Sequence, residues 1–277
     1  MLYLIATPIG NLKDITLRAL EVLKEVDIIA CEDKRVSLKL LHHYGISKTL
    51  FSYHDHNADK VRPHLLSFLK EGKKVAYITD GGMPLVSDPG FKLVRACQAE
   101  NLSYTVLPGA SAPLMALCLS GFSPDRFYFS GFLPSKSAAR CNSLEALKSL
   151  TVTLIFFESP KRLVLFLKDA QKVFGDREGA ICREMTKLYE EVQRGPLSSL
   201  VQHYEAIPPR GEIVVLIEGA SSLSSLSEEE LEAHLEKVLK TSSVKEAVEM
   251  VSKAFERSKR EVYQRALSLK EKKKSLS

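Results

Sequence analysis

The sequence predicts an α/β protein with two sheet-containing domains, followed by a small helical C-terminal domain. Short apolar runs rich in β-branched and aromatic residues alternate with segments whose apolar residues recur at i, i+3 and i+4. The length of 277 residues suits two domains or one large one. A serine-rich stretch at residues 220–227, with little apolar pattern, separates this part from a basic C-terminal segment.

Strands are expected in two series. The first series occupies residues 2–6, 28–31, 49–53, 74–79 and 104–107, and the second residues 127–129, 152–157, 180–183 and 212–217. Helical patterns lie between the strands, for instance at residues 16–25 and 163–174. This alternation favours mainly parallel sheets that helices cover on both faces. In such sheets ligands bind beyond the carboxyl ends of the strands.

Turns and composition place the domain boundaries. The turn at residues 108–111 divides a first domain, residues 1–110, from a second, residues 111–220. A third domain covers residues 225–277, where Ser227 with Glu230 and Ser243 with Glu246 form capping-box patterns. Each pattern opens an amphipathic helix, so this domain is predicted to be helical and not a disordered tail.

Composition favours an ordinary globular protein of the cytoplasm. With 45% hydrophobic and 26% charged residues, the chain can form a normal core. No stretch of about 18 consecutive apolar residues indicates a membrane span. The N-terminus reads as a first strand, since it reaches a Pro–Gly turn early and lacks a basic region typical of signal peptides. The odd number of cysteines, without a C-x-x-C pair, suggests reduced thiols.

Positive charge is concentrated at the C-terminal end. The net charge is +5, and residues 257–274 hold eight Lys and Arg against two Glu, a local charge of +6. Such asymmetry is typical of proteins that bind a polyanion. A solvated helix end would carry the same charges, so the charge pattern alone fits both interpretations.

Three Gly/Pro-rich loops follow predicted strands, at residues 6–11, 80–90 and 108–111. Glycine lets the backbone approach a ligand closely or adopt positive φ. The first loop alone could be an ordinary turn, since it is neither GxGxxG nor a Walker A motif. The loop at 80–90, DGGMPLVSDPG, combines more glycines, prolines and carboxylates than a turn needs. It is predicted to bind a ligand.

Several motifs together resemble one family. They are ATPIGNL at 6–12, ACEDKR at 30–35, YHDHN at 53–57, DGGMPLVSDPG at 80–90, PGAS at 108–111, REMTK at 183–187 and GEIVVLIEG at 211–219. In this order they resemble the tetrapyrrole-methylase superfamily, in its branch of ribosomal RNA small subunit methyltransferase I. SKREVYQRAL at 258–267 resembles that branch's C-terminal helical domain. One departure is Val36-Ser37, where the family commonly has His-Thr.

The resemblance implies a fold and an activity. It implies two α/β domains of tetrapyrrole-methylase type, with S-adenosylmethionine in the cleft between them, in a protein that is usually a homodimer. It also implies 2′-O-methylation of a cytidine ribose in the decoding region of 16S rRNA, so the expected partner is 16S rRNA or the small ribosomal subunit. A superfamily relative that C-methylates a tetrapyrrole precursor, and a non-catalytic RNA-binding assembly protein, are the alternatives.

Residues of the cofactor site follow from the loops and the resemblance together. Asp80, Gly81 and Gly82 would face the methionine part, because a carboxylate suits an ammonium group and backbone N–H groups suit a carboxylate. The first-domain wall would hold Pro8 and Gly10, and Ser87 and Ser111 would add hydrogen bonds. In the second domain the expected adenine contacts are Phe157, Met185 and Gly211, although Phe157 and Met185 equally fit a plain core.

Candidate catalytic residues lie at the end of the second predicted strand. Asp33 is the first candidate for the base and Glu32 the next, although either would also serve as a helix cap. Arg35 is a candidate phosphate clamp, since guanidinium binds phosphate bidentately. His54 and His56 form an H-x-H pair, but no Cys/His cluster supports a metal site, so none is expected.

Further basic residues are candidates for RNA contacts. They are the basic helix near residues 257–265, Lys136 and Arg140 on a stretch at 131–140 that is expected to be a mobile loop, and Lys161 with Arg162. Contacts of this kind would make RNA affinity fall with salt. The target ribose must be accessible, which favours single-stranded or looped RNA.

Overall fold

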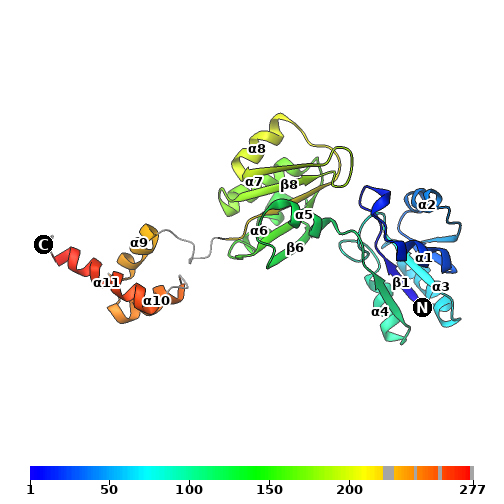
Figure 1. Ribbon diagram of the computed structural model, residues 1–277, viewed down its shortest axis with the longest axis horizontal. Helices are drawn as coiled ribbons and strands as arrows, with labels where there is room; N and C mark the ends of the chain where they lie inside the picture. Colours follow the sequence, from blue (N-terminus) through cyan, green and yellow to red (C-terminus); the bar gives the residue numbers. More distant parts are fainter. Residues whose placement is uncertain (221–227, 240–241, 255–257, 275–277) are drawn as a thin grey trace. The chain divides into compact units, whose positions relative to one another are not determined.

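The computed structural model describes residues 1–220, 228–239, 242–254 and 258–274 (Figure 1). They form two compact units, which are described separately. The first unit comprises residues 1–147 and 152–218, and the second comprises residues 148–151 and the described residues from Gly219 onward. Apart from residues 148–151 and 219–220, the first two predicted domains fall in the first unit, each with its own sheet, and the boundary between them near residue 110 stays a prediction.

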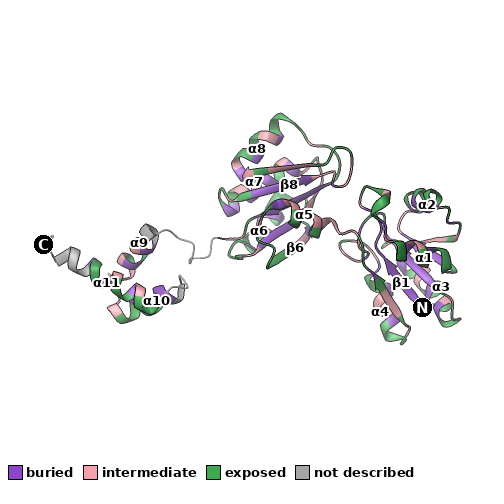
Figure 2. Ribbon diagram, viewed as in Figure 1, coloured by how far each residue is buried: buried purple, intermediate pink, exposed green. Residues whose placement is uncertain are grey.

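The first sheet is parallel throughout, in the order β3-β2-β4-β1-β5. Its strands are β1 (Leu2–Ile5), β2 (Ile28–Cys31), β3 (Thr49–Ser52), β4 (Val75–Ile78) and β5 (Tyr104–Leu107). The strands β2 and β4 are fully buried, because helices cover both faces of the sheet. Figure 2 colours buried residues purple. The predicted parallel sheet with two covered faces is confirmed here.

The helices of this sheet divide between its two faces. They are α1 (Leu17–Glu25), α2 (Lys34–His43), α3 (Ala58–Lys70) and α4 (Phe91–Ala99). Leu65 of α3 and Leu93 of α4 belong to one core cluster, and Leu23 of α1 and Leu41 of α2 belong to the other. Helix α1 begins one residue after the predicted start, because Thr16 is its N-cap: the Thr16 hydroxyl accepts the backbone N–H of Ala19 at 3.1 Å.

The second sheet is mixed, in the order β6-β7-β10-β8-β9. Its strands are β6 (Phe127–Phe132), β7 (Thr153–Glu158), β8 (Glu178–Arg183), β9 (Glu191–Pro196) and β10 (Ile213–Ile217). Only β6 and β7 pair in parallel, so the prediction of a mainly parallel sheet is wrong here. The strands β7 and β8, joined by a helix, do point the same way, but β10 runs antiparallel between them.

Helices also cover the second sheet, and they are α5 (Ala112–Ser120), α6 (Ser137–Glu145), α7 (Leu163–Phe174) and α8 (Leu197–Ala206). Ala116 of α5 packs in a core cluster with Ile155 of β7. The neighbouring Phe156 points to the other face, where its ring lies 5.2 Å from that of Phe166 in α7. The predicted helix at 163–174 is confirmed with both of its ends.

The prediction of a mobile loop at residues 131–140 is wrong. Strand β6 extends to Phe132, and helix α6 begins at Ser137. Arg140 is only 2% exposed, and its guanidinium pairs with Asp169 of α7 at 2.6 Å. It also donates to the carbonyl oxygen of Ser135 at 3.0 Å. Arg140 is therefore a buried structural residue and not an RNA contact, because its charge is already neutralised inside the fold.

The second unit is helical, with α9 (Glu228–Leu239), α10 (Val244–Ala254) and α11 (Lys259–Lys274). Leu235, Val251 and Val262, one from each helix, are fully buried in a common cluster. The predicted capping box at Ser243 is confirmed. The Ser243 backbone N–H donates to the Glu246 carboxylate at 2.9 Å, and the Glu246 backbone N–H donates to the Ser243 hydroxyl at 3.3 Å. The box predicted at Ser227, like the stretch 221–227, lies outside the described residues.

No helix in the described ranges is both long and apolar enough to cross a membrane.

A candidate active site at the strand ends

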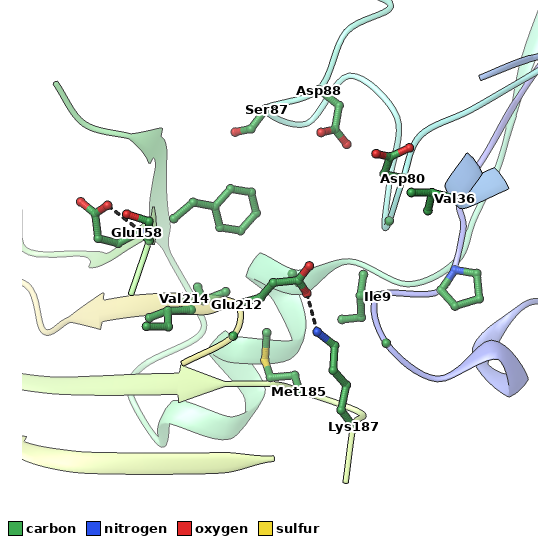
Figure 3. Close-up of a pocket in the computed structure, with 18 of the residues that line it drawn as sticks. Ile9, Val36, Asp80, Ser87, Asp88, Glu158, Met185, Lys187, Glu212 and Val214 are labelled. Atoms are coloured by element: carbon green, nitrogen blue, oxygen red, sulfur yellow. Dashed lines mark hydrogen bonds and ion pairs between the residues drawn. The ribbon is translucent and has the colours of Figure 1, made fainter. Parts of the chain in front are cut away.

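A cavity of about 710 Å³ lies at the carboxyl ends of β1, β2, β4, β7 and β8 (Figure 3). This volume falls within the range of about 300–1,000 Å³ typical of small-molecule sites. Residues of both sheets line it. They are Pro8, Ile9, Gly10, Leu12, Glu32, Val36, Asp80, Gly81, Ser87, Asp88, Ala112, Phe132, Phe157, Glu158, Ser159, Pro160, Met185, Lys187, Gly211, Glu212, Ile213 and Val214.

The loops after β1 and β4 are joined to each other. Thr7 and Gly82 exchange two backbone hydrogen bonds of 2.9 Å, and the Thr7 hydroxyl donates to the Thr79 carbonyl at 3.0 Å. The Gly82 amide is thus already used inside the protein, so it is not a free donor for a ligand, in contrast to the expectation from sequence. A side chain at Gly81 would bring a Cβ within 3.3 Å of the Pro8 carbonyl oxygen, which explains a glycine there.

The loop at residues 80–90 is held in a strained shape. Leu85 and Ser87 adopt φ of 72° and 66°, in the left-handed region that residues with a side chain rarely occupy. A Cβ on Gly131 of β6 would lie 2.8 Å from the Ser87 hydroxyl, so the loop packs closely on the second sheet. Backbone strain of this kind is concentrated at functional sites, where the surrounding structure maintains it.

Carboxylates dominate the charges that line the cavity. There are five, Glu32, Asp80, Asp88, Glu158 and Glu212, and one ammonium group, that of Lys187. The ammonium pairs with Glu212 at 3.0 Å and with Glu184 at 2.8 Å, and Glu158 pairs with Arg162 at 3.1 Å. Within the described ranges, Glu32, Asp80 and Asp88 have no ion-pair partner. Figure 3 shows Ser87, Asp88 and Asp80 on one side of the cavity, with Met185, Glu212 and Val214 facing them.

Burial makes these three carboxylates costly to ionise. Desolvation raises the pKa of Glu32, and the negative charge of Asp80 raises it further. The pKa of Asp80 is also raised by burial. The pKa of Asp88 rises to about 6, through burial and then through the charge of Glu32. A positively charged ligand would relieve this repulsion, so the cavity favours a cation.

Asp33 does not line the cavity. Its carboxylate caps α2 by accepting the Arg35 backbone N–H at 2.8 Å, and it pairs with the Arg35 guanidinium at 2.6 Å. Hydrogen bonds from the Arg35 side chain lower the pKa of Asp33 to about 2. Of the two interpretations left open, the structure shows the helix cap for Asp33. The neighbouring Glu32 reaches the cavity, while the Arg35 side chain is 87% exposed to solvent.

Most residues predicted for the cofactor site line one cavity. Eight of them line the main cavity: Pro8, Gly10, Asp80, Gly81, Ser87, Phe157, Met185 and Gly211. The other two, Gly82 and Ser111, line an adjacent pocket of about 60 Å³ that shares Gly81, Asp88 and Phe157. The contacts of these residues with a ligand stay predictions.

Sequence reasoning missed several lining residues. Asp88 lies within the loop at 80–90, but the pattern did not show that Asp88 lines the cavity as well as Asp80. Glu158, Ser159 and Pro160 follow β7 directly, and position at a strand end was the signal that could have found them. Lys187 belongs to the REMTK motif, and its role in the wall depends on the path of the loop after β8.

The remaining candidates do not themselves line the cavity. The rings of His54 and His56 are 5.9 Å apart, and no group of three or more His, Cys, Asp or Glu in the described ranges is arranged to hold a metal ion. Arg162 donates to the Leu133 carbonyl oxygen at 2.7 Å and pairs with Glu158, so it supports the cavity wall. Lys136 and Lys161 are exposed, and their contacts with RNA stay predictions.

Comparisons with known proteins agree with this geometry. Residues 1–201 match the family model of Tetrapyrrole (Corrin/Porphyrin) Methylases, and residues 225–270 match that of the RsmI C-terminal HTH domain. Ribosomal RNA small subunit methyltransferase I of Mesorhizobium japonicum is 45% identical over 272 residues, 98% of this chain and 92% of that protein. The protein of the same name from Thermotoga maritima is 46% identical over 218 residues, 79% of this chain and 98% of that one.

Among solved structures, cobalt precorrin-4 methyltransferase, a cobalamin biosynthetic enzyme, superposes with a TM-score of 0.60. The match covers 78% of this chain and 94% of that one. At 19% identity this likeness concerns the fold alone. It agrees with the α/β fold of this chain.

Proposed function

The chain belongs to the tetrapyrrole methylase family, among the ribosomal RNA small subunit methyltransferase I proteins, and from this premise we propose the reaction it catalyses. Methyltransferases of this family depend on S-adenosylmethionine. The proposed reaction moves the methyl group of this cofactor to the 2′-oxygen of a cytidine ribose in the decoding region of 16S rRNA. The proposed setting is the cytoplasm, with 16S rRNA or the small ribosomal subunit as the partner and a homodimer as the assembly.

One observation carries the proposal: the cavity holds three carboxylates without a cationic partner, Glu32, Asp80 and Asp88. S-adenosylmethionine has a sulfonium and an ammonium group against a single carboxylate, so it is the net cation that such a site favours. The apolar side chains of Phe157, Met185 and Val214 on the opposite wall suit the face of an adenine ring. Charge and shape of the cavity therefore both fit the cofactor.

When bound, the cofactor supplies a methyl group that its sulfonium already activates. The chain's residues have to align the ribose hydroxyl in line with the carbon–sulfur bond, since alignment supplies much of the catalysis in such a transfer. As the new carbon–oxygen bond forms and the carbon–sulfur bond breaks, the hydroxyl proton must leave. A positioned base favours this step late in the transfer.

Glu32 is the proposed base. It lines the cavity, whereas Asp33 is committed to capping α2. The raised pKa of Glu32 makes it a stronger proton acceptor than an ordinary carboxylate, while the pKa of Asp33 is lowered to about 2. This assignment reverses the order that the sequence favoured. It follows from which of the two adjacent side chains faces inward.

RNA binding is proposed for the second unit and its basic end. Lys259 and Arg260 are exposed at the start of α11, whereas Arg257 lies outside the described residues. The match to a helix-turn-helix domain supports a role in nucleic-acid binding. A cavity that only had to admit a small tetrapyrrole would not need this domain.

The test is the modified nucleotide itself. Small ribosomal subunits from cells lacking the protein would be incubated with the purified full chain and S-adenosylmethionine. We expect one new 2′-O-methylcytidine, which mass spectrometry of rRNA fragments would map to the decoding region. Methylation of a porphyrinoid and not of the subunit would support C-methylation of a tetrapyrrole, and no binding of S-adenosylmethionine in calorimetry would support a non-catalytic assembly protein.

A further inference from the structure

The loop between β8 and β9, residues 184–190, exposes two large side chains with apolar surface. Leu188 is 87% exposed and Tyr189 is 69% exposed. Within the described ranges, no other large hydrophobic side chain is as exposed as Leu188. Side chains of this kind cost free energy in water, and side by side on one loop they are typical of a binding surface.

The exposure does not come from a loose loop. The backbone N–H of Lys187 donates to the Glu184 carbonyl oxygen at 3.0 Å, and that of Glu190 donates to the Lys187 carbonyl oxygen at 3.2 Å. The Glu190 carboxylate accepts the Thr186 backbone N–H at 2.6 Å. Glu184 and Thr186 have positive φ values of 50° and 66°. The chain is thus fixed in a shape that holds Leu188 and Tyr189 outward.

This loop is also fixed to the wall of the candidate active site. Lys187 lines the cavity, and in Figure 3 its ammonium group points to Glu212, 3.0 Å away. A Cβ on Gly10 would lie 2.6 Å from Lys187 Cγ, so the lysine side chain lies against the loop after β1. Leu188 and Tyr189 follow Lys187 directly in the chain, so the exposed pair begins one residue beyond the cavity wall.

We propose that Leu188 and Tyr189 form a stacking platform for an unpaired RNA base next to the methylated nucleotide. The proposal rests on the proposed function. A ribose can reach the cavity only if its nucleotide leaves the stack, and the neighbouring base then loses a stacking partner. Exposed aromatic side chains replace that partner in single-strand recognition without a strong preference for sequence.

The charges around the loop favour a base over a phosphate. Glu190, which follows Tyr189 in the chain, and Glu212 are exposed, and Lys187, the cation that lines the cavity, is already paired with Glu184 and Glu212. Negative groups repel a phosphate but do not repel the face of a neutral base. The platform therefore complements the basic C-terminal segment, which would hold the RNA backbone elsewhere.

The test compares four variants in the full chain. Tyr189→Ala removes the ring, Tyr189→Phe keeps it, and Leu188→Ser removes the second apolar surface. Leu17→Ser changes a residue of α1 that is 80% exposed and does not line the cavity. The probes are small ribosomal subunits lacking the modification, and a single-stranded RNA oligonucleotide of the decoding region carrying 2-aminopurine beside the target cytidine. Quenching of 2-aminopurine fluorescence reports stacking.

We expect Tyr189→Ala to weaken binding of the oligonucleotide about tenfold and to remove the quenching, since stacking on one aromatic ring is worth about 1–3 kcal/mol per base. Leu188→Ser should have a smaller effect in the same direction. Tyr189→Phe and Leu17→Ser should match the wild type. Binding of S-adenosylmethionine, measured by calorimetry, should stay within twofold in all four variants, which also shows that they fold.

Two results would overturn the platform while leaving the proposed function in place. One is unchanged RNA affinity and quenching in Tyr189→Ala with normal methylation of the subunit. The other is a shift in the monomer–dimer equilibrium of that variant in sedimentation, without loss of RNA affinity, which would assign the surface to a second copy of the chain. A wild-type protein that neither binds nor methylates the RNA would overturn both proposals.

Discussion

Asp80 accepts the backbone N–H of Asp33 through its Oδ1 atom at a distance of 3.1 Å. This bond joins the loop after β4 to the start of α2, although the two residues are 47 positions apart in sequence. It uses one oxygen of Asp80 inside the protein and leaves the carboxylate charge in the cavity wall. Asp80 thus has two separable tasks, to fix the turn that carries Glu32 and to attract a cation.

Substitution of Asp80 should separate these tasks. Asp80→Asn keeps an acceptor for the Asp33 N–H but removes the charge, and Asp80→Ala removes both. We expect the asparagine variant to bind S-adenosylmethionine about tenfold more weakly, corresponding to ~1.4 kcal/mol, with nearly normal thermal stability. The alanine variant should bind more weakly still and melt earlier. Calorimetry and thermal unfolding measure the two effects, and unchanged affinity in both variants would remove Asp80 from the cofactor site.

Substituting each of the two adjacent carboxylates, Glu32 and Asp33, in turn identifies the base. Glu32→Gln should lower turnover by about 10²–10⁴-fold, the usual contribution of a positioned base. Asp33→Asn retains a good helix cap and should keep turnover within a few fold, while Asp33→Ala should cost about 1 kcal/mol of stability. Single-turnover methylation of the subunit is the measurement. The reverse order, with Asp33→Asn inactive and Glu32→Gln active, would restore the assignment that the sequence favoured.

Cofactor binding should depend on pH through Asp88. Its pKa is raised to about 6, so the side chain is ionised at pH 7.5 and protonated at pH 5. Protonation removes a negative charge, and the affinity for S-adenosylmethionine should fall by about tenfold between pH 7 and pH 5 through this linkage. S-adenosylhomocysteine, which lacks the sulfonium charge, should respond less. Calorimetry at several pH values checks this, and Asp88→Asn should flatten the curve.

The buried pair of Arg140 and Asp169 should matter for stability and not for RNA binding. Removing one partner of such a pair leaves an uncompensated charge, which typically costs about 3–5 kcal/mol. Arg140→Ala should therefore lower the free energy of unfolding in urea by roughly that amount. The salt dependence of RNA binding should stay as in the wild type. If Arg140→Ala had normal stability and a flatter salt dependence of RNA binding, Arg140 would be an RNA contact after all.

The lysines at the C-terminal end provide the complementary test. Lys272, Lys273 and Lys274 changed together to Ala should reduce the slope of log affinity against log salt by up to about 2, at roughly 0.7 per phosphate on single-stranded RNA. Filter binding between 50 and 300 mM salt measures the slope. An unaltered slope would show that these three lysines are only a solvated end of the chain.

The fold was predictable where local pattern decides structure. The strands Ile28–Cys31 and Tyr104–Leu107 have the ends that the sequence predicts, because each is a short apolar run between polar turns. Strand β9 (Glu191–Pro196) was missed, since Val192 is its only aliphatic residue before the final Gly-Pro. The mixed second sheet was also missed. Strand β10 lies between β7 and β8, and its partner β7 is about 60 residues earlier in the chain. A local sequence pattern cannot predict such a long-range pairing.

The site was predictable at the level of loops but not of single side chains. The sequence indicated the loop at 80–90 and the end of β2, and both border the cavity. It did not distinguish Glu32 from Asp33, because adjacent residues at a strand end point in different directions and the cap of α2 decides which. It also placed Arg140 on the surface, because a lone arginine in a polar stretch gives no sign of its partner Asp169.

The position of β10 sets the order in which the molecule can be completed during synthesis. Ile213 and Val214 line the cavity, and the same strand lies between β7 and β8 in the sheet. Before residues 213–217 have been synthesised, the second sheet lacks the strand that lies between β7 and β8. A nascent chain can fold its first sheet early, but we expect it to hold a cofactor only after β10 has paired with β7 and β8.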